Sequence, residues 1–185
     1  MKLASPVLGF LVGLSVVGVG SVSQAAPKQP DAAPIVTMVT DRGTILIKLF
    51  PKEAPISTAN FIKLINKGFY NGLTFHRITD LEQGTPSKIV QGGDPNGDGS
   101  GGSPDHIKGE FSSNGVSNPL THNAGAVAMA RSSDNDSASS QFYICVNPVH
   151  FLDGNYAVFG QVIKGLDVAG KLQIGDHMTK VTVAP

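Results

Sequence analysis

One loop of the 185-residue chain has the spacing of a calcium-binding loop. In Asp94-Pro95-Asn96-Gly97-Asp98-Gly99 the side-chain oxygens fall at the first, third and fifth positions and glycine at the sixth, and Asp105 falls at the twelfth, as in an EF-hand. An EF-hand also needs a helix on each side, whereas a β-rich run precedes this loop and a glycine- and serine-rich stretch follows it. We therefore expect no metal and no other cofactor, with a stabilising calcium ion as the alternative.

Serine, histidine and cysteine side chains raise the question of nucleophilic catalysis. The sequence contains no G-x-S-x-G elbow, which argues against a serine hydrolase of that type. Cys145 is the one cysteine, so an intrachain disulfide and a cysteine metal cluster are both excluded. Because Cys145 lies in the apolar run Phe142–Val146, we expect a buried structural thiol.

Four separated segments carry more specific information than any single motif. They are Phe75-His76-Arg77-Ile78, Gln91-Gly92-Gly93-Asp94, Ser139-Ser140-Gln141-Phe142-Tyr143-Ile144, and Phe151-Leu152-Asp153-Gly154 followed by Val158-Phe159-Gly160. In this order, and with Pro55 and Asn60-Phe61 ahead of them, they closely resemble the cyclophilin family of peptidyl-prolyl isomerases. The resemblance runs from about Ile35 to the C-terminus.

The resemblance implies a mainly β fold, namely a closed eight-stranded antiparallel β-barrel capped by two α-helices. Side chains would fill the interior of such a barrel, so the ligand groove would lie on its outer face. Residues 35–185 would form this isomerase domain, after a signal peptide over residues 1–26 and a linker over residues 27–34.

The resemblance also assigns roles to individual residues. Arg77 matches the catalytic arginine of the family, and Gln91 matches a glutamine that holds the substrate backbone. Ala130 and Arg131 match an edge segment whose backbone pairs with the substrate peptide, and Gln141 matches a polar residue beside the groove. Tyr143, Phe151 and Leu152 match residues that line the proline pocket. Tyr156 is expected to close the edge of this pocket, and Ile89 is expected to add contact to it.

An arginine beside an apolar pocket suffices for this chemistry. Rotation about an X-Pro bond crosses a barrier of about 18–20 kcal/mol because it destroys amide resonance. At the twisted transition state the prolyl nitrogen regains a lone pair, and a charged donor aimed at that nitrogen stabilises the twisted state more than either planar isomer. Guanidinium keeps its charge at any working pH. No proton transfer is needed, so we expect a structural role for His76.

Four positions depart from the family pattern, and one of them is Tyr156, which stands where many relatives carry histidine and is expected to tune the site. Lys88, at the end of an unusually long 79–88 stretch, falls where an aromatic pocket wall is common, so either Ile89 compensates or the longer loop supplies another group. Phe151 replaces the tryptophan of cyclosporin-sensitive forms, which predicts weak cyclosporin binding because the indole N–H is lost. Arg131 is larger than usual but is expected to act through its backbone. The altered pocket also leaves open a binding module that grips proline segments without turnover.

The hydrophobic patterns predict the elements that position these residues. Residues 35–40 and 44–50 read as a hairpin closed by Asp41-Arg42-Gly43. Thr58, Phe61, Ile62 and Ile65 lie on one face of a helix that begins at Pro55. Further strands are expected over residues 74–78, 88–92, 124–130, 141–146, 157–162 and 179–183, with a short helix over residues 165–172. Many short strands without a βαβ rhythm indicate an antiparallel barrel or sandwich.

The N-terminus predicts export from the cytoplasm. Lys2 precedes an uncharged apolar stretch over residues 7–20, and Ser23-Gln24-Ala25 fits the small-x-small pattern of a signal peptidase site. We expect cleavage near Ala25 or Ala26 and a periplasmic or secreted domain. An uncleaved membrane anchor is the alternative, although the apolar stretch is shorter than the roughly 20 residues that span a bilayer.

Composition limits the partners. Lysine and arginine total 14 and aspartate and glutamate total 14, so the net charge is about zero, and no basic run is present. This argues against a nucleic-acid or anionic-membrane partner. No stable membrane insertion is expected after cleavage of the signal peptide. The expected partners are proline-containing polypeptides, and a monomer is expected.

Overall fold

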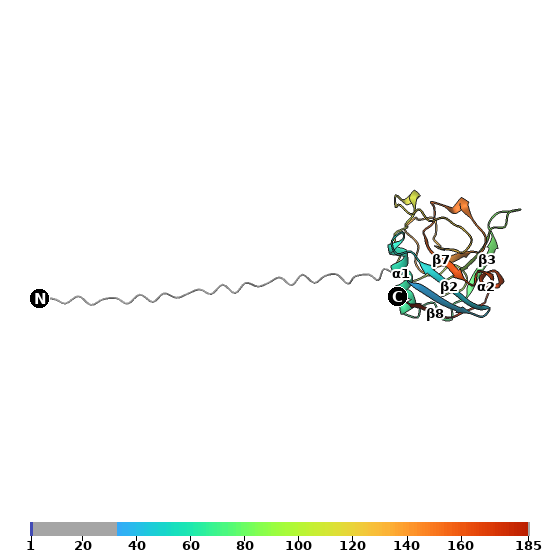
Figure 1. Ribbon diagram of the computed structural model, residues 1–185, viewed down its shortest axis with the longest axis horizontal. Helices are drawn as coiled ribbons and strands as arrows, with labels where there is room; N and C mark the ends of the chain where they lie inside the picture. The colour runs from blue at the N-terminus through green and yellow to red at the C-terminus, as the bar shows by residue number, and fades with distance from the viewer. Residues whose placement is uncertain (2–32, 185) are drawn as a thin grey trace.

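A computed structural model describes Met1 and residues 33–184, so the predicted signal peptide lies outside the described residues. The fold is mainly β, with two helices packed against one curled antiparallel sheet (Figure 1). The helices are α1 (Pro55–Asn66) and α2 (Leu166–Lys171), and two 3-10 turns are η1 (Ser112–Asn114) and η2 (His150–Leu152). The strands are β1 (Ile35–Thr40), β2 (Gly43–Leu49), β3 (Phe75–Asp80), β4 (Lys88–Gly92), β5 (Ala126–Met129), β6 (Phe142–Cys145), β7 (Val158–Lys164) and β8 (Met178–Ala184).

The eight strands follow the order β3-β4-β6-β5-β7-β2-β1-β8, so β3 and β8 are the two ends of the sheet. The expected closed barrel is wrong in this respect. Thr74 and His177, which lie just outside the two strands, form a single bridge. The N–H of Phe75 donates to the carbonyl of Asp176 at 2.9 Å, and the N–H of Met178 donates to that of Leu73 at 2.8 Å. The strands meet only near these ends, so the ladder does not continue along them.

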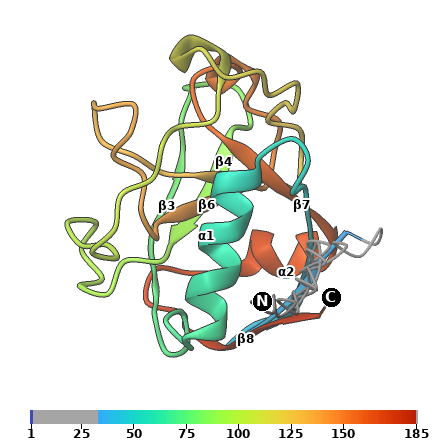
Figure 2. The same cartoon turned by 90° about the vertical axis from the view of Figure 1, so that its left-hand side faces the viewer.

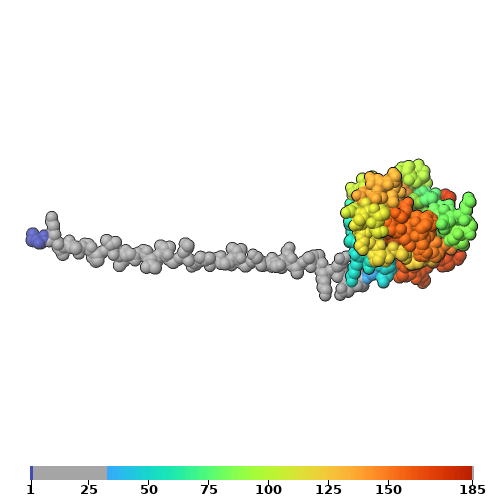
Figure 3. Space-filling view, turned by 90° about the horizontal axis from the view of Figure 1, so that it is seen from above, coloured from blue at the N-terminus to red at the C-terminus, as the bar shows by residue number. Residues whose placement is uncertain are grey.

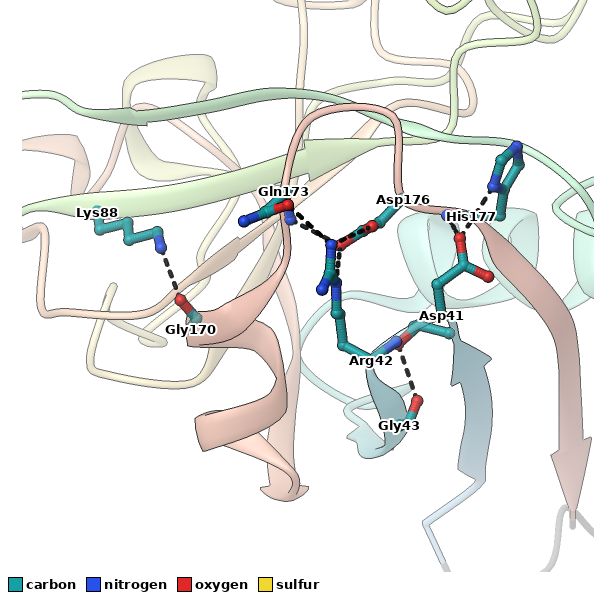
Figure 4. Close-up of polar contacts among 9 residues, drawn as sticks. Asp41, Arg42, Gly43, Lys88, Gly170, Gln173, Asp176 and His177 are labelled. Carbon is teal, nitrogen blue, oxygen red and sulfur yellow. Dashed lines mark hydrogen bonds and ion pairs between the residues drawn. The ribbon is translucent and has the colours of Figure 1, made fainter.

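Side chains brace this junction from the β1–β2 turn (Figure 4). Arg42 donates from Nε to Asp176 Oδ2 at 2.7 Å and from Nη2 to Asp176 Oδ1 at 3.0 Å. These bonds hold the pKa of Asp176 below its usual value. Asp41 accepts the backbone N–H of His177 at 2.8 Å, and that bond is the main reason why the pKa of Asp41 is lowered.

The interior of the curled sheet is filled by side chains, as expected. Helix α1 lies across one side of the sheet (Figure 2) and inserts Phe61 into an aromatic cluster. The Phe61 ring centroid lies 4.9 Å from that of Tyr70, 5.3 Å from that of Phe142 and 5.1 Å from that of Phe159. Because side chains fill this core, a ligand site is expected on the outer face.

Helix α1 receives its N-terminal cap from a distant residue. The carboxylate of Glu110, which is 1% exposed, accepts the N–H groups of Ile56 at 2.8 Å and Ser57 at 2.7 Å. Pro55 at the first helical position has no N–H to satisfy. None of the helices in the described part of the chain is long and apolar enough to cross a bilayer.

Candidate active site

The register of the sheet sets a row of side chains on its outer face. Arg77 of β3 is paired with Gln91 of β4, Gln91 with Tyr143 of β6, and Tyr143 with Ala128 of β5. Residues directly opposite each other in an antiparallel sheet point to the same face. Val90, which alternates with Gln91, points into the core instead.

A β-bulge aims Arg77 outward. Phe75 pairs with Gly92 and Arg77 pairs with Gln91, so β3 contains one extra residue, His76, relative to β4. Without it, Phe75 and Arg77 would point to the same face; with it, Phe75 is fully buried while Arg77 is exposed. Burial lowers the pKa of His76, and neither ring nitrogen has a hydrogen-bond partner among the described residues. The structure therefore assigns His76 a structural role, as the extra residue of the β-bulge.

A small cavity of about 230 Å³ opens beside Arg77. This volume is below the roughly 300–1,000 Å³ of drug-sized pockets, which suits a single ring. The orange segments near residue 150 and the green projection near residue 80 face the same side of the molecule (Figure 3). The residues that line the cavity are Arg77, Leu81, Ile89, Gln91, Ala130, Arg131, Tyr143, Phe151, Leu152 and Tyr156. The structure thus brings together every predicted site residue except Gln141.

Gln141 belongs to a polar chain that leads away from this cavity. Arg77 Nη1 donates to Gln91 Oε1 at 3.1 Å, and Gln91 Nε2 donates to Gln141 Oε1 at 2.8 Å. Gln141 Nε2 in turn donates to the carbonyls of Gly99 at 2.9 Å and Gly101 at 2.7 Å. These bonds fix Gln91 and therefore restrict the guanidinium of Arg77 to one side of the cavity.

A second cavity of about 350 Å³ adjoins the first and shares Gln91, Ala130 and Arg131 with it. Its other lining residues are mostly small and polar and include the 99–103 segment and Gln141. A peptide that fills the first cavity can extend over Ala130 and Arg131 into the second one.

The side chain of Arg131 has a larger role than the backbone role expected from the sequence. Its guanidinium carbon lies 4.7 Å from the ring centroid of Tyr156 and 5.1 Å from that of Phe111. Nε and Nη2 donate to the carbonyl of Asn155 at 3.2 and 3.0 Å. Arg131 and Tyr156 therefore form one rim of the first cavity, while Phe151, which is 48% exposed, stands at its mouth.

Lys88 does not form a pocket wall. It alternates with Ile89 along β4, so it points away from the outer face, and its Nζ donates to the carbonyl of Gly170 in α2 at 2.7 Å (Figure 4). Leu81, from the longer loop after β3, lines the cavity and packs against the cluster of Ile89 and Tyr143. Of the two alternatives, the structure therefore supports the one in which the longer 79–88 loop supplies another group to the pocket, and that group is Leu81.

The calcium alternative finds no support in the loop geometry. The carboxylate of Asp94 accepts the N–H groups of Asn96 at 2.9 Å, Asp98 at 3.1 Å and Gly99 at 2.6 Å, so it serves the turn itself. No group of three metal-ligating side chains occurs within residues 33–184. Cys145 is buried, and burial raises its pKa to about 12, as befits an unreactive thiol.

His122, which the sequence did not single out, lies behind the cavity. It is fully buried, with Nδ1 2.8 Å from Asp153 Oδ1 and Nε2 2.9 Å from the hydroxyl of Tyr143. Burial lowers the pKa of His122, and the hydrogen bond to Asp153 only partly opposes this shift. His122 sits in a loop outside all four recognised segments, so no motif pointed to it.

Comparison with known proteins decides the family. Residues 35–184 match the family described as cyclophilin type peptidyl-prolyl cis-trans isomerase/CLD. The chain belongs to the cyclophilin family. This cyclophilin is 42% identical over 146 residues to peptidyl-prolyl cis-trans isomerase B of Bacillus subtilis, with 79% of the chain and 94% of the relative covered. It is 37% identical over 151 residues to a peptidyl-prolyl cis-trans isomerase of Helicobacter pylori, with 80% and 86% covered.

A solved structure agrees with this assignment. The cyclophilin of Cryptosporidium parvum, crystallised in the presence of the dipeptide Ala-Pro, superposes with a TM-score of 0.71 and 25% identity. The match covers 82% of the present cyclophilin and 99% of that chain. The protein is thus an isomerase of X-Pro peptide bonds, and its outer-face cavity is the candidate active site.

Leu81→Ala tests the assignment of the pocket wall. We expect KM for a proline peptide to rise about three- to tenfold, because the change removes apolar contact worth about 1 kcal/mol. Lys88→Phe is expected to change KM by less than about twofold and to lower the free energy of unfolding by about 1 kcal/mol, since it removes the bond to Gly170. Glu82→Ala, in the same loop, is the control. A Lys88→Phe protein that binds proline peptides more tightly would contradict the assignment.

Proposed function

We propose that Arg77 is the catalytic residue of this cyclophilin and acts by stabilising the twisted prolyl amide. The observation that carries the proposal is its exposed guanidinium at the rim of a ring-sized cavity, hydrogen-bonded to Gln91. The cavity holds the proline ring while the preceding carbonyl rotates. The guanidinium then donates to the prolyl nitrogen, whose lone pair is available only in the twisted state.

The surroundings of Arg77 favour such differential binding. The nearby lining groups from Ile89, Tyr143 and Leu152 are apolar, and they reduce the screening of a charged hydrogen bond by water. One donor of Arg77 is occupied by Gln91, which fixes the guanidinium plane, and a planar guanidinium has further donors for the substrate. No acid or base is required, since no proton is transferred.

Proline-containing polypeptides are the proposed substrates. The dipeptide Ala-Pro that accompanies the Cryptosporidium parvum structure supports this class. The adjoining second cavity gives room for residues beyond the X-Pro pair. We further propose that the protein acts as a monomer.

The proposed setting is the folding of exported proteins. It rests on Lys2, the apolar stretch over residues 7–20 and the Ser23-Gln24-Ala25 cleavage pattern. The full chain, expressed with a C-terminal tag in a Gram-negative host, should appear in the periplasmic fraction with a new N-terminus after Ala25 or Ala26. A cytoplasmic protein that retains Met1 would contradict the proposal.

Arg77→Ala is expected to lower kcat by about 10²–10³-fold, because it removes a donor that acts mainly in the transition state. KM should change little, since the apolar cavity stays intact. Arg77→Lys should restore little activity, because a single ammonium cannot keep the bond to Gln91 and also reach the prolyl nitrogen. NMR exchange between the cis and trans forms of a proline peptide measures these rates.

The control for this experiment is Lys180→Ala, which removes an exposed positive charge from β8. Circular dichroism melting of each variant verifies the fold. An Arg77→Ala protein with the wild-type rate would exclude the proposed mechanism.

Cyclosporin inhibition is expected to be weak, with an inhibition constant above about 1 μM, because Phe151 has no donor where a tryptophan would have its indole N–H. Phe151→Trp should tighten binding by about three- to tenfold, the range that one added hydrogen bond provides. Titration of isomerase activity with cyclosporin measures both. Sub-micromolar inhibition of the unmodified protein would refute this expectation.

A further inference from the structure

Two parts of the proline pocket come from segments that do not pair with each other as strands. Tyr143 lies on β6 and presents its ring to the cavity, where it is 4% exposed. Phe151 and Leu152 lie on η2, and Asp153 follows them directly. The distance between the ring and this segment sets the width of the pocket, so something must hold the two in place.

His122 contacts both parts. Its ring lies nearly parallel to that of Tyr143, with 10° between the planes and 6.0 Å between the centroids. Asp153 Oδ1 accepts both the backbone N–H of His122 at 2.7 Å and a bond from its Nδ1 at 2.8 Å. The carbonyl of His122 accepts the N–H of Val149, which precedes η2, at 2.8 Å.

We propose that His122 is a positioning residue of the isomerase site, which holds Tyr143 at a fixed place relative to the segment that carries Phe151 and Leu152. The inference rests on the proposed function, because the cavity it organises is the proposed proline pocket. His122 does not itself line the cavity; it acts through Tyr143, which does, and through Asp153.

The hydrogen-bond pattern fixes the direction of each proton. A carboxylate only accepts, so Nδ1 of His122 carries the proton that faces Asp153. Nε2 of the neutral ring is then an acceptor, and the hydroxyl of Tyr143 must donate to it. The Tyr143 proton therefore points away from the cavity, which leaves the apolar ring for the proline.

Protonation of His122 would reverse the second bond. Imidazolium Nε2–H is a donor, so the Tyr143 hydroxyl would have to accept and turn its own proton elsewhere. The other groups that face this pair are few. Charged or titratable neighbours of His122 are Asp153 and His150, and those of Tyr143 are Cys145, Tyr156, Arg131 and Asp153.

The sign of the pH effect follows from the direction of the shift. The pKa of His122 is lowered in the folded protein, so the unfolded chain binds more protons once the pH falls below about 6.5. Stability is therefore lost as the pH falls through that window. Wherever His122 is protonated in the folded protein, KM should rise because the Tyr143 hydroxyl is misdirected.

Four variants separate the two contacts of His122. An asparagine amide reaches about as far as Nδ1, so His122→Asn keeps the bond to Asp153 alone. A glutamine amide reaches about as far as Nε2, so His122→Gln keeps the bond to Tyr143 alone. His122→Leu removes both, and Tyr143→Phe removes the hydroxyl and leaves the ring. His177→Gln is the control, because His177 is exposed and its ring pairs with Asp41.

The variants are compared by kcat and KM for a proline peptide from pH 5 to pH 8. We expect His122→Leu and Tyr143→Phe to raise KM at pH 7.5 by about three- to tenfold, the range of one lost hydrogen bond, with kcat within about twofold. His122→Asn and His122→Gln should be intermediate. The acid rise in KM should persist in His177→Gln and vanish in His122→Leu and Tyr143→Phe.

A folded His122→Leu protein with wild-type KM and an unchanged pH profile would overturn the proposal. If His122→Leu fails to fold, Tyr143→Phe decides: a wild-type KM together with the wild-type acid rise overturns it. Arg77→Ala keeps the two proposals separate, since it should lower kcat and spare KM. An active Arg77→Ala protein beside His122 variants of raised KM would exclude the Arg77 mechanism and leave the positioning role standing.

Discussion

The whole site depends on one local irregularity, the extra residue at His76 in β3. A regular strand would place Phe75 and Arg77 on the same face, so either a phenylalanine would leave the core or the arginine would enter it. The bulge allows a buried phenylalanine and an outward guanidinium to lie two residues apart on one strand. The full burial of Phe75 in the core stabilises this bulged conformation.

The register of the strands then determines which side chains lie next to one another on the outer face. Arg77, Gln91 and Tyr143 stand side by side because β3, β4 and β6 are paired in this alignment. On one side of the row, amide hydrogen bonds run through Gln141 to the glycine loop. On the other side, Tyr143 is bonded to buried His122. Arg77, Gln91 and Tyr143 are thus held by hydrogen bonds from two directions, through Gln141 on one side and through buried His122 on the other.

Much of this arrangement could be predicted from the sequence. The strands and helices have the predicted order, and their ends agree within two residues, because alternating and helical patterns report local structure directly. Nine of the ten cavity-lining residues were among the site residues predicted from the sequence. The one missed, Leu81, lies in the longer loop, where no periodicity indicates which side chain turns inward.

The failures share a physical cause, because each concerns packing between distant segments. The family resemblance placed Lys88 at the position of a pocket wall without deciding what replaces that wall, and strand alternation turns its side chain away toward the carbonyl of Gly170. His122 acquires its importance only when folding places it between Tyr143 and Asp153. The prediction of a closed barrel was wrong because β8 meets β3 only near one end and not along its length.

That last feature has a consequence for local motion. The strand that carries Arg77, like β8 at the other end of the sheet, has a full ladder on one side only, so it can detach with fewer broken backbone bonds than an inner strand. Its free flank is tethered near Phe75 by the backbone of Asp176, whose side chain is gripped by Arg42. A turn between the first two strands thereby contributes to the opening free energy of the strand that carries Arg77.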